Sequence, residues 1–323
     1  MKVQNAIAVL LIAVCTLGLA TAFADDAYPN RPIRLIVPYG AGGASDVMAR
    51  QFGQKLGDRL GQPIIVENQA AAAGTVAYTT VARSTPDGYT LVYGTSSIAV
   101  NAVLKASPPY DPVTGFQPIS MLLAIQNVLV VPNSLPASSV SELVQLAKSK
   151  PGELNYVSLG TGSTPHLSAE LFRAAAGINI QQVAYKQTTQ AYVDLIENRV
   201  QLWIASMPSA LPHVQTGKLR ALAVTGSRRS PAAPDVPTLV ESGIPAESIF
   251  WQGLFGPAGT PTSVVQKLNA AVRYVVANPE TRAWYLKLGA ELGASSPDEL
   301  GLAVREEMGK WTKIANDIGI ERN

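Results

Sequence analysis

A short unit recurs three times along this chain: an apolar strand, a turn rich in Gly, Ser and Thr, and then a helix. It occurs at residues 35–50 (LIVPYGAGGASDVMAR), 90–104 (TLVYGTSSIAVNAVL) and 154–172 (LNYVSLGTGSTPHLSAELF). An apolar strand that feeds a helix needs a sheet covered by helices, because each element must bury its apolar side. The recurrence therefore predicts an α/β protein.

The rest of the chain continues this alternation of strands and helices. Strands are expected at 33–39, 63–68, 89–94, 116–132 (one or two strands), 154–160, 178–185 and 250–257. Helices are expected from Met48 to Leu60 and at 75–84, 139–152, 166–177, 263–278 and 297–318. Such alternation predicts βαβ units and mainly parallel sheets. The Pro- and Gly-rich stretch 226–261 favours two sheet domains that exchange crossing segments.

The N-terminus predicts export. A positive start at Lys2 is followed by an uncharged apolar run at 6–20, and then by Ala22 and Ala24 at the −3 and −1 positions of a cleavage site. These features are typical of a secretory signal peptide over residues 1–24. The alternative is a retained membrane anchor, but the run is short and ends in small residues.

Composition narrows the class of protein further. The one cysteine, Cys15, lies inside the predicted signal, so the exported chain has no disulfide or thiol chemistry available. With 25 basic against 23 acidic side chains and no basic run, the sequence indicates no nucleic acid partner. A length of 323 residues and an apolar fraction of 47% suit about two well-buried domains.

The recurring turns are candidate anion sites. The first turn of a helix leaves backbone N–H groups unpaired, and the aligned peptide dipoles add partial positive charge there. Glycine lets a ligand approach the backbone closely, and Ser or Thr donates a further hydrogen bond. Such a site holds a carboxylate or a phosphate without any Lys or Arg.

A simpler interpretation treats the same residues as helix caps. Ser45, Asp46, Ser163 and Thr164 are all favourable near a helix start, and Pro165 suits the first helical turn. We assign Asp46 to capping in particular, since its own charge disfavours contact with an anion. The three units together leave capping and anion binding both open.

The sequence lacks complete motifs for nucleotide binding, metal binding and nucleophilic catalysis. GTGSTP at 160–165 lacks the third glycine of a dinucleotide loop, and no GxxxxGK[ST] motif is present. His166 and His213 are the only histidines, and neither HExxH, an Asp-x-Asp loop nor GxSxG occurs, so no metal site or nucleophile elbow is predicted. A secreted hydrolase that uses Ser163 with His166 as its base stays as the alternative.

Seven ordered blocks from about residue 28 onward give the chain a resemblance to a known family. They read YPNRPIRLIVPYGAGGASDVMAR, GQPIIVEN, TPDGYTLVYG, YKQTTQAYVDLI, GKLRALAVTGSRR, APDVPTLVESG and FWQGLFGPAGTPTSVVQKLN. In these seven blocks the chain resembles the Bug-type substrate-binding receptors of tripartite tricarboxylate transporters.

The resemblance implies a type II periplasmic binding protein: two α/β domains with a ligand cleft between them and two crossing segments. On this basis we place domain 1 at 25–124 plus 251–323 and domain 2 at 125–250. The resemblance further implies a periplasmic, monomeric, non-enzymatic receptor without metal or cofactor. Its ligand would be a small carboxylate, such as a di- or tricarboxylate or an aromatic acid, passed to membrane subunits of the transporter. A sensory partner that presents its ligand to a membrane protein is the other alternative.

The resemblance also implies which residues touch the ligand. In domain 1 they are Tyr39, Gly40, Ala41, Gly42, Gly43, Ser45 and Asp46, with Thr95, Ser96 and Ser97 on the same side. In domain 2 they are Thr161, Gly162, Ser163, Thr164 and His166, with Tyr185 and Lys186 nearby. One cradle in each domain suggests that each grips one end of a two-headed ligand.

Two stretches depart from the family pattern. The turn after the 63–68 strand is usually Gly-rich but here reads NQAAAAG (68–74), and Gln187-Thr188-Thr189 replaces another Gly-rich stretch. Alanine lacks the positive-φ freedom of glycine, so the 69–74 turn is expected to differ in shape. Both changes are expected to alter ligand choice.

Overall fold

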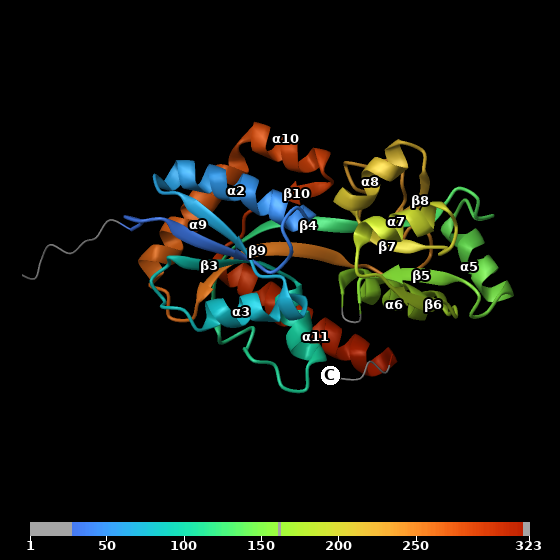
Figure 1. The fold of residues 1–323 in the computed structure, drawn as a ribbon, viewed down its shortest axis with the longest axis horizontal. Coiled ribbons are helices and arrows are strands. Elements are labelled where there is room, and N and C mark those ends of the chain that lie inside the picture. Colours follow the sequence, from blue (N-terminus) through green and yellow to red (C-terminus); the bar gives the residue numbers. More distant parts are fainter. Residues whose placement is uncertain (1–27, 161–162, 319–323) are drawn as a thin grey trace, which may run out of the picture.

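The computed structural model describes residues 28–160 and 163–318, which form two α/β lobes (Figure 1). The predicted signal peptide at 1–24, and with it Cys15, lies outside the described residues. Among the helices of the described part, none combines the length and the apolar character that crossing a bilayer requires.

Lobe 1 is built on a sheet in the order β10-β4-β9-β3-β1-β2. Its strands are β1 (Ile33–Val37), β2 (Ile64–Asn68), β3 (Thr90–Thr95), β9 (Ile249–Pro257), β10 (Ala290–Leu292) and the first half of β4 (Phe116–Pro132). Its helices are α2 (Ala44–Leu60), the short 3-10 helix η1 (Ala71–Gly74), α3 (Thr75–Ala82), α4 (Ser97–Leu104), α9 (Thr262–Ala277), α10 (Pro279–Lys287) and α11 (Pro297–Ile318).

Helices cover both faces of the lobe 1 sheet. Met48 and Phe52 of α2 pack with α9 on one face, against Leu35 and Tyr93 of the sheet. On the other face Tyr78 of α3 packs with side chains of α4 and α11. The alternation of side chains along each strand explains this arrangement, because successive residues point to opposite faces.

Lobe 2 is smaller. Its strands are the second half of β4, β5 (Asn155–Ser158), β6 (Gln181–Ala184), β7 (Trp203–Ser206) and β8 (Leu219–Val224). Its helices are α5 (Val140–Ser149), α6 (Thr164–Ala176), α7 (Thr188–Ile196) and α8 (Met207–Gln215). β7 and β8 pair with β4, and a parallel bridge between Tyr156 and Leu202 links the β5–β6 pair to them. Phe172, Leu143 and Ile204 contribute to its core.

Strand β4 runs through both lobes. Residues 116–126 pair with β9, whereas residues 127–132 pair with β7 and β8, so the partners change between Gln126 and Asn127. The chain returns to lobe 1 through the segment between Val224 of β8 and Ile249 of β9. The two lobes are therefore connected by two crossing segments, as a type II binding protein requires.

The expectation of mainly parallel sheets is wrong. β1, β2 and β3 pair in parallel, as do β5 and β6, but β4 is antiparallel to β7, β8, β9 and β10, and β9 is antiparallel to β3. The reason is topological, because the crossing strands β4 and β9 run back and forth through the centre of the molecule. The parallel βαβ units are confined to the outer parts.

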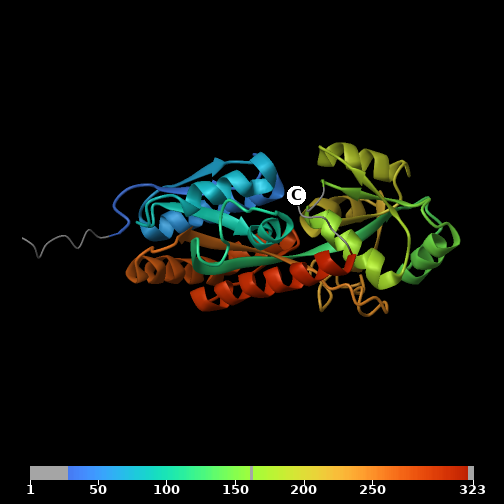
Figure 2. The same cartoon turned by 90° about the horizontal axis from the view of Figure 1, so that it is seen from below.

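Helix α11 reaches from lobe 1 towards lobe 2 (Figure 2). Its Trp311 is buried against Val100 and Leu104 of α4 and against Leu167 of α6, so one apolar cluster joins the two lobes. Leu167 lies one residue after His166, which places this contact directly beside the start of α6.

Candidate functional site

The first candidate site is the turn from β1 into α2, residues 39–46, here called the first cradle. Figure 1 shows α2 beginning on the side of lobe 1 that faces lobe 2. Gly42 has φ 78°, a conformation open to glycine, and the N-cap residue Gly43 provides no side-chain cap. Among the described residues no acceptor meets the N–H groups of Ala44 and Ser45. These donors are therefore available to an anion.

Asp46 holds the first cradle in shape. Its Oδ2 accepts the Gly42 N–H at 2.8 Å, and its Oδ1 accepts Asn68 Nδ2 at 2.9 Å. Arg50 donates from Nε to the Asp46 carboxylate at 3.1 Å and from Nη2 to Asn68 Oδ1 at 2.8 Å. These bonds brace the turn before α2, although the N-cap residue is Gly43 and makes no side-chain cap, so the assignment of Asp46 to capping stays a prediction.

The charge of Asp46 is fixed by the same contacts. Burial acts to raise the pKa of Asp46, but hydrogen bonds from Arg50, the Gly42 N–H and Asn68 outweigh it and hold that pKa below its ordinary value of 3.8. The carboxylate is thus ionised at neutral pH and turned towards the protein, with its side chain 4% exposed. The partnerless groups of the first cradle are thus the backbone N–H groups of Ala44 and Ser45, among the described residues, and not this charge.

Hydroxyl groups gather beside the first cradle. The Tyr39 hydroxyl lies 2.9 Å from Thr95 Oγ1 and donates to Ser97 Oγ at 3.2 Å. Ser97 Oγ lies 2.8 Å from both Thr95 Oγ1 and the Tyr78 hydroxyl. The structure thus brings together Tyr39, Thr95 and Ser97 as predicted, and adds Tyr78 of α3, which the sequence analysis missed.

The start of α4 continues this hydroxyl cluster. Ser96 is the N-cap residue but makes no side-chain cap, and its buried Oγ has no hydrogen-bond partner among the described residues. A buried hydroxyl without a partner is costly unless something bonds it. Within the described part of the chain Ser96 Oγ is therefore an unsatisfied buried hydroxyl next to Thr95 and Ser97, and its predicted contact with a ligand stays a prediction.

The Ala-rich turn at 69–74 takes an unusual backbone. Ala72 adopts φ 50°, a left-handed conformation uncommon for a residue with a side chain, and Gly74 follows with φ 89°. A Cβ at Gly74 would meet Pro38 at 2.8 Å, so the turn packs closely on the chain just before the first cradle. The predicted effect of this turn on ligand choice stays a prediction.

The second candidate site is the turn from β5 into α6, residues 160–166, here called the second cradle. Thr161 and Gly162 lie outside the described residues. Gly160 has φ 102°, and Ser163 is the N-cap residue of α6 without a side-chain cap. Ser163 Oγ instead accepts the Leu159 N–H at 3.3 Å. Thr164 begins the helix and Pro165 follows within its first turn, as the sequence predicts.

His166 is a buried, neutral residue at the second cradle. Burial lowers the pKa of His166 below its ordinary value of 6.5; the nearby Arg173 also lowers it, while Glu170 opposes both. Glu170 itself accepts the Tyr156 hydroxyl at 2.6 Å and Arg173 Nε at 2.9 Å. The carboxylate that acts on the pKa of His166 is therefore already paired with other groups.

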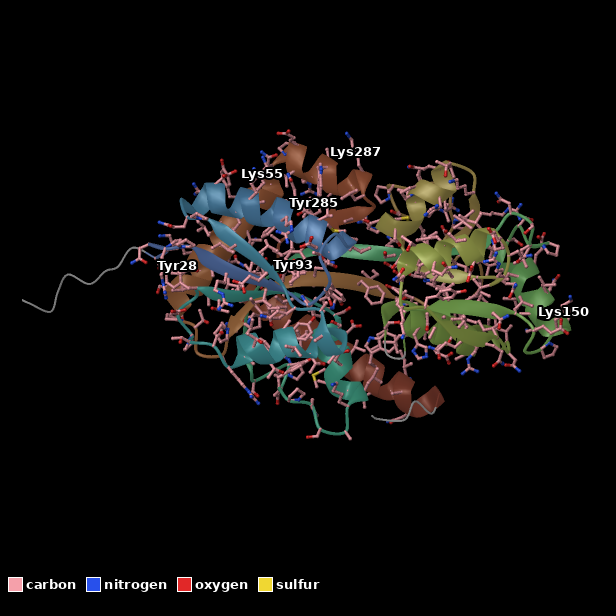
Figure 3. The ribbon with its side chains drawn as sticks, in the orientation of Figure 1. Tyr28, Lys55, Tyr93, Lys150, Tyr285 and Lys287 are labelled. Carbon is pink, nitrogen blue, oxygen red and sulfur yellow. The ribbon has the colours of Figure 1, made fainter. Side chains whose placement is uncertain are left out.

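Tyr185 and Lys186 follow strand β6. The Tyr185 hydroxyl donates to Asp194 Oδ2 at 3.0 Å, and burial together with this bond raises the pKa of Tyr185 to about 12. Lys186 is exposed and forms no ion pair with a described residue. Figure 3 places two other lysines on outer surfaces, Lys55 on α2 and Lys150 at the end of lobe 2 beyond α5.

A further helix start in lobe 2 was missed by the sequence analysis. β7 ends at Ser206, the N-cap residue of α8, whose Oγ lies 2.9 Å from Ser209 Oγ. Ser209 is also bonded by the hydroxyl of Tyr192, on which His213 stacks at 4.1 Å. The sequence SMPS at 206–209 could have predicted this helix start, because a serine is followed by a proline in the first helical turn.

The groups gathered at the two cradles are hydrogen-bond donors and hydroxyls, which suit an anion. No group of three or more His, Cys, Asp or Glu residues able to hold a metal occurs within residues 28–160 and 163–318. A groove of about 610 Å³ does lie on lobe 1 between α2 and β2, lined by Arg50, Gly53, Gly57 and Val66 among others. It runs along the flank of α2 and not over the helix starts.

Comparison with known proteins points the same way. Residues 48–320 match the family described as Tripartite tricarboxylate transporter family receptor. Protein BugT of Bordetella pertussis is 35% identical over 322 residues, 99% of each chain.

Solved structures agree with the fold. Rpa4515 of R. palustris, solved with adipate, is 36% identical with a TM-score of 0.84, covering 91% of this chain and 99% of that one. MatC of Rhodopseudomonas palustris, solved with bound malate, is 33% identical with a TM-score of 0.79, covering 89% and 99%. Both ligands named for these proteins are dicarboxylates.

Proposed function

Because this chain belongs to the tripartite tricarboxylate transporter receptor family, whose members are solute-binding receptors and not enzymes, we propose that it captures a small dicarboxylate between its two lobes. Membership of a receptor family also decides against the hydrolase alternative. The ligands of Rpa4515 and MatC support a small carboxylate as the ligand class here.

The observation that carries the proposal is the chemistry of the two cradles. Each lobe presents a helix start with a glycine in a left-handed conformation and without a side-chain cap, since the N-cap residue is Gly43 in α2 and the non-capping Ser163 in α6. Within the described part of the chain, Arg50 and Arg173 are already paired with Asp46 and Glu170 and so are not free cations for a ligand. Backbone N–H groups and hydroxyls are well suited to bind a carboxylate under these conditions.

We assign one carboxylate to each cradle. The first carboxylate would bind Gly40–Ser45 with Thr95, Ser96 and Ser97, and the second would bind 161–164 with His166. Tyr39 would order the hydroxyls around the first, while Asp46 would hold the turn without touching the ligand. Tyr185 and Lys186 would border the second. Bridging waters are compatible with useful affinity in such a site.

The two crossing segments supply the means of closure. We place the lobe boundaries at 25–124 plus 251–323 and at 125–250, which agrees with the change of β4 partners between Gln126 and Asn127. Rotation of one lobe about these segments would bring the two cradles onto opposite ends of a ligand.

Periplasmic location and delivery to membrane subunits complete the proposal. The family consists of periplasmic binding proteins, and residues 1–24 have the pattern of a secretory signal. We propose that the exported monomer passes its ligand to the membrane subunits of a tripartite tricarboxylate transporter.

A ligand screen tests this function. The purified chain is heated with malate, adipate, succinate, citrate or an aromatic acid, and the melting temperature is compared with that of the chain alone. A ligand that binds only the folded state raises the melting temperature according to its affinity and concentration. A rise with at least one dicarboxylate supports the proposal, and no rise with any of these acids contradicts it.

A further inference from the structure

Gln252 lies beside the first cradle, although it belongs to β9, 207 residues from Ser45 in the chain. It is 4% exposed, and its backbone is paired with Thr95 of β3 across the sheet. Directly paired residues of antiparallel strands place their side chains on the same face. The Gln252 amide therefore lies between the hydroxyl cluster at Thr95 and the beginning of α2.

The amide of Gln252 makes one side-chain contact with the first cradle. Its Nε2 donates to Ser45 Oγ at 3.1 Å. Its Oε1 is closed off from solvent and has no hydrogen-bond partner among the described residues. The bond to Ser45 is thus the one polar contact of this side chain within the described part of the molecule.

This bond decides how the Ser45 hydroxyl can act. A serine hydroxyl has one proton to donate, and it accepts through its lone pairs. Because Ser45 Oγ already accepts from Gln252 Nε2, one of its lone pairs is directed at the amide and its proton points away from that donor. Ser45 lies in the first turn of α2, where the backbone N–H groups of Ala44 and Ser45 have no acceptor among the residues that the structure describes.

We propose that Gln252 is a positioning residue that turns the Ser45 hydroxyl into a third donor for the anion in the first cradle. The inference rests on the proposed function, since it assumes that an anion binds there. Gln252 does not touch the ligand in this proposal, and its effect on binding passes through Ser45. It also ties the first cradle to β9, the strand by which the second crossing segment re-enters lobe 1.

The proposal predicts that substituting Gln252 weakens binding only while the Ser45 hydroxyl is present. Gln252→Met keeps the length of the side chain and removes both the donor and the unpaired Oε1, so the variant is expected to fold. Loss of a hydrogen bond to a charged group reduces affinity by about tenfold or more, which is the expected effect of Ser45→Ala. Gln252→Met is expected to weaken binding about three- to tenfold in the presence of Ser45 and less than twofold in Ser45→Ala.

A double-mutant cycle measured by titration calorimetry tests this. Wild type, Ser45→Ala, Gln252→Met and the double variant are titrated with the acid that binds wild type most tightly in the ligand screen. Gln117→Met serves as a control for the same chemical change, because Gln117 lies in the same sheet and donates to Pro118 O instead. It is expected to leave affinity unchanged, and melting temperatures confirm that all variants are folded.

The outcomes distinguish failure of the positioning role of Gln252 from failure of the proposed receptor function. A loss on Gln252→Met that disappears in the Ser45→Ala background supports the positioning role. An equal loss in both backgrounds, or no loss in either, overturns the positioning role and leaves the receptor function standing. Wild type that binds none of the acids overturns both.

Discussion

Asn127 and Thr225 join the two crossing segments by reciprocal hydrogen bonds. The Asn127 N–H donates to Thr225 Oγ1 at 3.0 Å, and the Thr225 N–H donates back to Asn127 O at 2.9 Å. Thr225 Oγ1 also donates to Ser248 O at 2.5 Å. Both residues are almost fully buried, at 0% and 1% exposure, at the point where β4 passes from lobe 1 into lobe 2. The connection between the lobes is therefore a buried polar junction.

Thr225→Val tests the contribution of this junction to stability. The substitution keeps the shape of the side chain but leaves the Asn127 N–H and the Ser248 carbonyl without their partner. Two buried groups left unsatisfied are expected to cost about 2–4 kcal/mol in the free energy of unfolding, measured by urea denaturation. Thr80→Val is the matched control, since the Thr80 hydroxyl donates only to Val76 O, in a solvent-exposed hydrogen bond of α3. Equal free energies of unfolding for the two variants would show that the hydrogen bonds of Thr225 stabilise the fold no more than an exposed one does.

Asp46→Asn tests the charge that holds the first cradle. The pKa of Asp46 is lowered in the folded state, so its ionised form stabilises the fold at pH values above 3.8. That contribution is lost as the pH falls below 3.8 and through the lowered pKa. The variant is expected to be about 1 kcal/mol less stable than wild type at pH 7, with the difference vanishing on acidification. Unfolding free energies measured from pH 7 to pH 2 check this, and a difference independent of pH would contradict it.

Tyr39→Phe tests the hydroxyl cluster. The change removes the bonds from Tyr39 to Thr95 and Ser97 and frees these hydroxyls to turn away from the ligand. Affinity for the bound acid is expected to fall about three- to tenfold in calorimetric titrations. Tyr274→Phe is a suitable control, because Tyr274 is 61% exposed on α9. A Tyr39→Phe protein that binds as tightly as the control would remove Tyr39 from the site.

The double substitution Ser163→Ala with Thr164→Ala tests the second cradle. It removes two hydroxyls from the start of α6 while keeping the backbone of the helix. Carboxylate binding is expected to weaken about tenfold or more, with the protein still folded. Calorimetry together with a melting curve checks both parts. Unchanged affinity in a folded variant would place the second carboxylate elsewhere.

Much of the fold could be predicted because apolar periodicity is a local signal. The helix expected at 263–278 is observed as Thr262–Ala277, and the one expected at 297–318 begins at Pro297. Elements without such a signal were missed. β10 has three residues and exists because it pairs with β4, and α8 contains Pro212 in its interior. The antiparallel centre of the sheet was missed for the same reason, since strand direction is set by tertiary pairing.

The residues of the candidate site likewise fall into those that the sequence could predict and those that only the fold brings together. Gly42, Gly43 and Ser45 are visible in the sequence, because a turn into a helix is a local motif. Tyr78 and Gln252 are not, since each sits in an apolar helix or strand and reaches the site only through the fold. Gly94 instead makes room for Phe255, because a Cβ there would lie 3.0 Å from the Phe255 ring, whereas the Tyr78 ring would be in ordinary contact at 3.7 Å. Contacts between distant segments of this kind leave no pattern along the chain.

The central claim is that two cradles hold two carboxylates, and a comparison of adipate with hexanoate tests it most directly. The two acids have the same chain length but differ by one carboxylate, so the comparison removes the group assigned to one cradle. Calorimetric titration is expected to show adipate binding at least about a hundredfold more tightly, since one carboxylate accepts two or more charge-assisted hydrogen bonds. Hexanoate binding as tightly as adipate would contradict the two-cradle account.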